Sequence, residues 1–163
     1  MQIFIIDYSP ERAAGMLCDL HLRKMCLETA QILSSVMFRQ GKTLLPEMPR
    51  PYNLRHPVIM AVDTPLKVNW TVCHNSALHQ EYFKRFGKHH AYFPLAAAYC
   101  NILFTAGIKK RPELLDFARA FKGIDIDEPD IVNAYRIYYR YKKSIIKNWS
   151  YTNSEEPEWL TVF

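Results

Sequence analysis

The stretch CDLHLRKMCLETAQILSSV, residues 18–36, decides the fold class. Its apolar residues recur every three or four positions, so at about 100° per residue they fall on one face of a helix. The residues of this apolar face are Leu22, Met25, Cys26, Ile32, Leu33 and Val36. Upstream, Ser9 is a good N-cap and Pro10 suits the first helical position. We therefore expect helical structure from Pro10 to about Phe38, with a break between Gly15 and Cys18.

The rest of the chain also favours helices over strands. Only 5 of its 163 residues are glycine, which argues against a β architecture rich in tight turns. Apolar periodicity, caps and prolines predict a short helix at 58–62 and longer ones at 65–86, 93–106, 112–121 and 129–149. Residues 1–7 are predicted to be a buried extended or β segment. The expected fold is a single, mostly helical (all-α) domain over residues 1–163 with this short N-terminal extended segment.

Composition and charge limit the function classes. A hydrophobic content of 49% is enough for a packed core. No apolar run approaches the roughly 20 residues of a membrane span, and the first residues do not resemble a secretory signal. We therefore expect a cytoplasmic protein, in the host cytoplasm if it is viral. The net charge of +5 favours a polyanion as partner, although a merely basic soluble protein would look the same.

The first long helix carries a polar stripe beside its apolar face. His21, Lys24, Glu28 and Gln31 follow one another at spacings of three, four and three residues, so they line up along the helix. They combine an imidazole, a cation and a carboxylate, the groups that general acid–base catalysis uses. The alternative is a solvated helix face with a Lys24–Glu28 ion pair.

Further candidates for nucleic-acid contact lie on the later segments. Arg55 and His56 end an irregular, proline-rich loop, and loops of that length are often functional. The last long helix interleaves tyrosines with cations, a combination that suits stacking on bases and contact with phosphates. Those tyrosines could equally be core residues, and the cations at the end of the second long helix could simply complement its dipole. The candidate DNA-binding residues on these segments are Arg55, His56, Trp70, Arg85, Lys88, His89, Arg136 and Arg140.

No cofactor or metal is expected from sequence motifs. The glycine-rich nucleotide-binding loops and the serine-hydrolase and zinc-protease signatures are absent. The four cysteines form no CxxC pair and no recognisable zinc spacing. His89 and His90 are adjacent, which is poor metal geometry. Their spacing leaves open a site that combines them with a more distant histidine, namely His21, His56 or His74.

The order of these motifs resembles the small helical pyrimidine-dimer DNA glycosylases of phages, the endonuclease V type. Asp19-Leu20-His21-Leu22 leads to Glu28 as the family's Asp-x-His-Leu leads to its catalytic Glu. Lys84 to Gly87 and the aromatic, basic region from Tyr135 to Trp159 are similar to the family's middle and C-terminal segments. The sequence also looks like a group of uncharacterised phage proteins.

This resemblance implies a mechanism in which the N-terminal α-amino group attacks C1′ of the sugar and forms a Schiff base, assisted by Glu28. Because Gln2 is large, we expect Met1 to be retained and its amine to serve. In addition, Gln31 stands where the family has an arginine.

The leading hypothesis is a DNA-repair or DNA-modifying enzyme. It would be a glycosylase, with or without abasic-site lyase activity, that acts on a damaged or modified base flipped out of double-stranded DNA. His21, Lys24 and Gln31 would orient Glu28. One alternative is a non-enzymatic nucleic-acid-binding module, and another is a phage protein that binds a host factor or a nucleotide.

Overall fold

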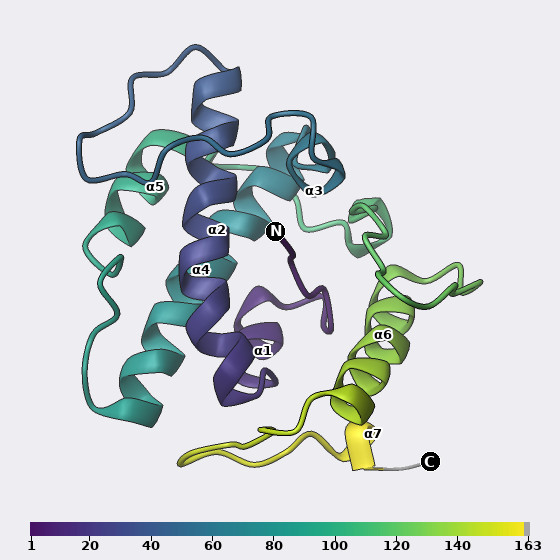
Figure 1. Cartoon of the computed structure of the whole chain (residues 1–163). Coiled ribbons are helices and arrows are strands. Elements are labelled where there is room, and N and C mark those ends of the chain that lie inside the picture. The colour runs from purple at the N-terminus through teal and green to yellow at the C-terminus, as the bar shows by residue number, and fades with distance from the viewer. Residues whose placement is uncertain (162–163) are drawn as a thin grey trace.

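The computed structural model describes residues 1–161 and is helical (Figure 1). Its helices are α1 (Pro10–Gly15), α2 (Asp19–Arg39), α3 (Pro57–Ala61), α4 (Pro65–Phe86), α5 (Leu95–Leu103), α6 (Ile131–Ile145) and α7 (Glu158–Thr161), with a 3₁₀ turn η1 (Pro112–Leu114) before α6. No strand occurs within residues 1–161, so the helical class is confirmed but the predicted N-terminal β segment is not. No helix in the described part of the chain is long and apolar enough to cross a bilayer.

Local chemistry sets most helix ends. The Ser9 hydroxyl accepts a hydrogen bond from the Arg12 amide at 3.2 Å and so caps α1. Thr64 caps α4 in the same way, and Gly87 ends that helix with a φ of 65°, a conformation that glycine adopts without strain. Asp130 caps α6 through the Asn133 amide at 2.8 Å. The predicted break before Cys18 is confirmed by the separation of α1 from α2.

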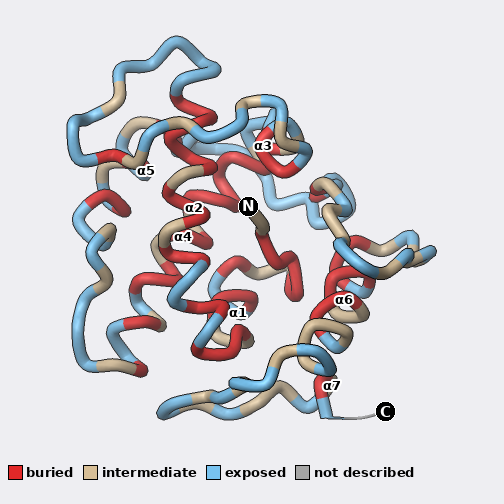
Figure 2. The backbone as a smooth tube through the Cα atoms, in the orientation of Figure 1, coloured by how far each residue is buried: buried red, intermediate tan, exposed pale blue. Residues whose placement is uncertain are grey.

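Helices α2 and α4 lie side by side and form the centre of the fold, with α1 and α5 packed on α4 (Figure 1). The N-terminal segment runs between this group and α6, and residues 3–7 are buried (Figure 2). Phe4 packs edge-on against Tyr139 of α6, with ring centroids 5.1 Å apart. The guanidinium of Arg136, also on α6, donates to the Ile6 carbonyl at 2.9 Å. The N-terminal segment therefore joins α6 to the rest of the core.

The predicted helix over residues 112–121 is wrong beyond its first turn. Leu115 and Phe117 are buried, but the backbone around them follows an irregular path. Tertiary hydrogen bonds replace helical ones there, because the Tyr135 hydroxyl donates to the Ala118 carbonyl at 2.6 Å and the Gln2 side-chain amide donates to the Ala120 carbonyl at 3.3 Å.

Candidate active site

Glu28, in the middle of α2, is held from two sides. Its side chain is buried, and Oε2 accepts a hydrogen bond from the backbone nitrogen of Gln2 at 2.8 Å. The other oxygen, Oε1, lies 3.4 Å from Nζ of Lys24, one turn earlier on the same helix. The carboxylate therefore joins the start of the chain to the polar stripe of α2.

The burial of the N-terminal segment explains why residues 1 and 2 reach Glu28. Ile3, Phe4, Ile5 and Ile6 are nearly inaccessible to solvent, so this apolar run anchors the segment in the core. The Phe4 ring also packs on His21, with centroids 4.6 Å apart. The side chain of Gln2 adds a 3.3 Å hydrogen bond to the Ala120 carbonyl. The chain start is thus fixed beside α2, as Figure 1 shows.

A cavity of about 600 Å³ opens where these parts meet. Three lysines line it, namely Lys24, Lys122 and Lys142, and none of the described lining residues is acidic. The volume is in the range of small-molecule sites, and the lysines favour an anionic ligand. The full lining is Met1, Gln2, Phe4, Leu20, His21, Lys24, Met25, His56, Ala120, Lys122, Tyr138, Lys142 and Ile146.

The two histidines of the cavity differ in environment. Burial, with smaller contributions from the charges of Lys24 and Lys142, lowers the pKa of His21 to about 4. His21 is therefore neutral near pH 7, and its ring lies against Phe4, Tyr139 and Trp149. The pKa of His56 is also lowered, first by partial burial and then by the charge of the Met1 amine, while Glu28 acts in the opposite direction.

His56 also starts α3, because its Nδ1 accepts from the Val58 amide at 3.2 Å. This capping bond fixes the ring at the cavity wall. The structure thus brings together Met1, His21, Lys24, Glu28 and His56 of the predicted residues. Gln31, half-buried one turn beyond Glu28, and Arg55, exposed beside His56, lie outside the lining.

Arg85 is buried, whereas a residue that contacts DNA phosphates must reach the protein surface. Only 1% of the residue is exposed, and its guanidinium donates to the carbonyls of Gly15, at the end of α1, and Leu17, in the α1–α2 connection, at 2.7 Å each. It also contacts Asp19 at 3.2 Å and Glu81 at 2.7 Å. Because the guanidinium is buried and committed to these internal contacts, we assign Arg85 to the core.

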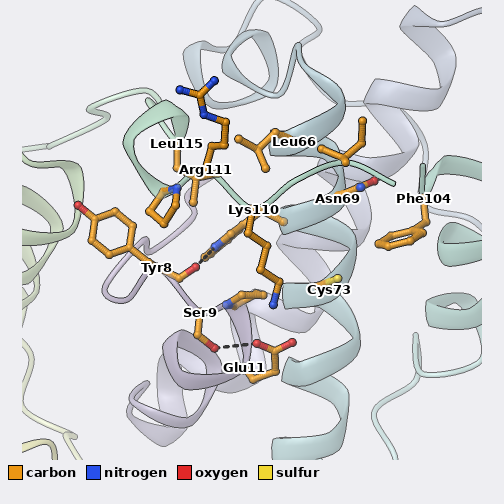
Figure 3. Close-up of a pocket in the computed structure, with 14 residues that line it drawn as sticks. Tyr8, Ser9, Glu11, Leu66, Asn69, Cys73, Phe104, Lys110, Arg111 and Leu115 are labelled. Atoms are coloured by element: carbon orange, nitrogen blue, oxygen red, sulfur yellow. Dashed lines mark hydrogen bonds between the residues drawn. The ribbon is translucent and has the colours of Figure 1, made fainter. Parts of the chain in front are cut away.

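Trp70 is also separated from Glu28. Its indole N–H donates to the Tyr8 carbonyl at 2.8 Å, and its ring stacks on His74 with centroids 4.7 Å apart. It lines a different, largely apolar cavity of about 300 Å³, whose lining residues, among them Tyr8 and Lys110, are drawn in Figure 3. Trp70 therefore lies apart from the Glu28 cavity, and its contact with DNA stays a prediction.

The remaining predicted basic residues form two groups, one after α4 and one on α6. Lys88 and His89 follow α4, and the His89 ring is stacked between Phe83 and Phe93, with centroids 4.6 and 4.0 Å away. On α6, Arg140 donates from two nitrogens to the Trp159 carbonyl, at 2.9 and 2.7 Å. Arg136 is half-buried and lies 3.5 Å from Asp7. The two α6 arginines therefore help to attach the N- and C-terminal segments.

Sequence reasoning did not single out Lys122, Tyr138 and Lys142 as parts of this site. Lys142 and Tyr138 belonged to the aromatic, basic pattern of the last helix, but no spacing rule distinguishes them from Tyr135 or Lys147. Tyr135, Tyr138 and Tyr139 are all buried, so this part of the predicted stacking surface is core. Lys122 lies in an irregular loop whose position depends on its contacts with α6, such as the bond from the Lys122 amide to the Tyr138 hydroxyl at 3.3 Å.

Comparison with known proteins identifies one matching protein family. The family model described as pyrimidine dimer DNA glycosylase matches residues 1–94, which include the N-terminal segment, α2, His56 and α4. No curated protein and no solved structure matches the chain. The matched region contains Met1, Lys24 and His56 of the cavity lining, and Glu28, which contacts Gln2 and Lys24 of that lining. Lys122 and Lys142 lie beyond the matched region.

Proposed function

This chain belongs to the pyrimidine dimer DNA glycosylase family, and we propose that it cleaves the glycosidic bond of a damaged pyrimidine at the cavity beside Glu28. DNA is the substrate that the family implies. A nucleotide flipped out of the duplex would enter the cavity between α2 and α6. The single observation that carries this proposal is the 2.8 Å hydrogen bond between the Gln2 nitrogen and Glu28.

The N-terminal amine would be the nucleophile. In its neutral form it attacks C1′, the C1′–N bond breaks, and the electron pair leaves with the base, which gains a proton. The attached nitrogen loses one proton, the ring oxygen takes up a proton as the C1′–O4′ bond breaks, and an iminium (protonated Schiff base) forms between the chain and C1′. Glu28 would accept a proton from the attacking amine and stabilise the positive charge that develops on the sugar.

A lyase step follows from the same intermediate. The iminium acidifies the C2′ hydrogens, so loss of one proton to a base expels the 3′ phosphate and breaks the strand. Glu28 is the carboxylate that contacts the start of the chain, through the Gln2 nitrogen, and we assign it as that base. Water then hydrolyses the imine and frees the amine.

The cations of the cavity would hold the DNA. Lys24, Lys122 and Lys142 line the space that the flipped nucleotide would occupy, and they would neutralise the phosphates on either side of it. Arg55, Lys88 and His89 are exposed and would contact the duplex farther out. His21, a neutral ring at the cavity wall, would position the sugar rather than carry charge.

Borohydride trapping tests the chemistry directly. The protein is incubated with duplex DNA containing one cyclobutane thymine dimer, with the same duplex undamaged, and with a duplex containing an abasic site, each with borohydride. A covalent adduct on the dimer and abasic duplexes, but not on the undamaged one, is expected. Cleavage of the glycosidic bond with no adduct would contradict the amine mechanism, and the absence of both would contradict glycosylase action on this dimer.

Peptide mapping of the adduct locates the nucleophile. The crosslink is expected on the α-amino group of Met1. A crosslink on Gln2 would mean that Met1 had been removed, which would leave a free amine at the nitrogen that already contacts Glu28. A crosslink on a lysine would contradict the assignment of the chain start.

A further inference from the structure

A cluster of metal-binding side chains lies away from the Glu28 cavity. Cys26 of α2, His79 of α4 and His90 of the segment after α4 each offer one ligand atom, and these three atoms lie within 4.8 Å of one another. Cys26 is two residues before Glu28, so it points about 200° around the helix from it. The cluster therefore occupies the side of α2 that packs on α4.

The environment of the His79 ring is the observation that points to a bound ligand. It is 1% exposed, and both of its ring nitrogens are buried with no hydrogen-bond partner in the described part of the chain. A buried polar group without a partner destabilises a protein by roughly 1–3 kcal/mol. A metal ion on one of these nitrogens would satisfy it, and Cys26, completely buried in the same place, would supply a thiolate.

The chemical type of the three ligand atoms indicates which metal ion they would bind. One sulfur and two imidazole nitrogens are ligands of Zn²⁺, whereas Mg²⁺ and Ca²⁺ prefer oxygen, and the cluster contains no carboxylate. In a tetrahedral zinc site such donors lie about 3.4–3.6 Å apart. Donor atoms within 4.8 Å therefore need to close by only about 1 Å on binding.

We propose that Cys26, His79 and His90 form a three-ligand site for Zn²⁺, with a water molecule as the fourth ligand. The ion would link α2, α4 and the segment that follows α4. Lys88 and His89 lie on that segment, so zinc would also fix the position of these two cations. This proposal is independent of the proposed glycosylase activity.

Binding of zinc to His90 would change one hydrogen bond of the segment after α4. In the metal-free form, Nδ1 of His90 accepts a hydrogen bond from the Tyr92 amide at 3.3 Å. If zinc binds Nδ1, that lone pair is used; if it binds Nε2, Nδ1 carries the proton and cannot accept. Either way the Tyr92 amide loses this acceptor when the metal binds.

The test measures metal directly, with protein purified through a tag that contains no histidine. We expect one zinc per chain by elemental analysis. After exchange into Co²⁺, we expect the visible bands of a tetrahedral ion and an ultraviolet band from thiolate to cobalt. In the amide spectrum, the Tyr92 signal should shift on loading. Less than stoichiometric zinc, together with no tetrahedral cobalt spectrum, would overturn the proposal.

Matched variants locate the site. Cys26→Ala should abolish the thiolate band, and His90→Ala, at a half-buried position, should weaken cobalt binding at least tenfold without loss of the fold. The controls are Cys100→Ser, an exposed thiol on α5, and His89→Ala, the neighbour of His90 that is stacked on Phe83 and Phe93. Equal loss of cobalt binding in His89→Ala, or unchanged binding in a folded His90→Ala, would contradict the ligand set.

Discussion

The backbone nitrogen of Gln2 donates to Oε2 of Glu28 across 26 positions of sequence, at 2.8 Å. This contact links the first residues to the helix that carries the polar stripe. Glu28 is therefore the first residue to test by substitution.

Glu28→Gln should slow cleavage of the glycosidic bond by roughly 10²–10⁴-fold, the usual contribution of a general acid–base group. The amide oxygen of glutamine can still accept from the Gln2 nitrogen, so folding and DNA affinity should be nearly unchanged. Single-turnover cleavage of dimer-containing DNA and a gel-shift titration measure the two effects. Glu11→Gln, at an exposed position beside the other cavity, is the control and should behave as wild type. Unaltered cleavage of the glycosidic bond by Glu28→Gln would remove Glu28 from the mechanism.

Lys142→Gln should weaken DNA binding in a salt-dependent way. If Lys142 neutralises one phosphate, its loss should reduce the slope of log affinity against log salt by about 0.9. Lys110→Gln, which changes a lysine of the separate cavity, is the matched control and should leave the slope unchanged. A non-enzymatic nucleic-acid-binding module could show the same salt effect, but it would not release a base. Equal slopes for wild type and Lys142→Gln would show that this lysine contacts no phosphate.

Arg85→Met should destabilise the fold by about 3–5 kcal/mol, because it leaves the buried Asp19 carboxylate without its cation and removes the guanidinium from Glu81. Chemical denaturation gives the free energy of unfolding. Lys84→Met removes the exposed neighbour that also lies near Glu81, at 3.5 Å, and should change stability by less than about 1 kcal/mol. DNA affinity per folded molecule should not change in Arg85→Met. A folded variant that lost DNA binding would restore the phosphate-binding hypothesis for Arg85.

His21 should make stability depend on pH. Its pKa in the folded state is about 4, below the ordinary value of 6.5, so the unfolded chain takes up a proton first as pH falls. Stability should therefore be complete above pH 6.5 and decrease between pH 6.5 and 4, by up to about 1.4 kcal/mol per pH unit for this group. Carboxylates also titrate in this range, so the comparison must be with a variant.

His21→Phe removes the titrating group and keeps an aromatic ring among Phe4, Tyr139 and Trp149. Its free energy of unfolding should decrease less steeply than that of wild type below pH 6.5. Identical pH profiles for the two proteins would mean that His21 is protonated equally in both states.

The parts of the fold that follow local chemistry could be predicted from the sequence. The caps at Ser9 and Thr64 and the glycine at 87 depend on neighbouring residues only, and each acts where its type predicts. The helix expected over 112–121 failed because bonds from distant residues, such as Tyr135 to Ala118, satisfy that backbone instead. No pattern within the segment contains those partners.

In the candidate site, too, contacts within one helix could be predicted from the sequence and contacts between distant segments could not. The spacing of Lys24 and Glu28 on one helix was sufficient to pair them. Arg85 looked like a surface cation because helical spacing does not reveal that the α1–α2 connection covers it. The meeting of Cys26, His79 and His90 depends on how α2 packs on α4, which no linear spacing encodes.

The buried N-terminal segment has a practical consequence for making the protein. Since Met1 lines the cavity and residues 3–6 are fixed in the core, any residues added before Met1 would have to leave through that cavity. An affinity tag at this end would fill the space proposed for the nucleotide and convert the terminal amine into an amide. Recombinant protein intended for assay should therefore carry its tag at the C-terminus, or have a free α-amino group restored by cleavage before use.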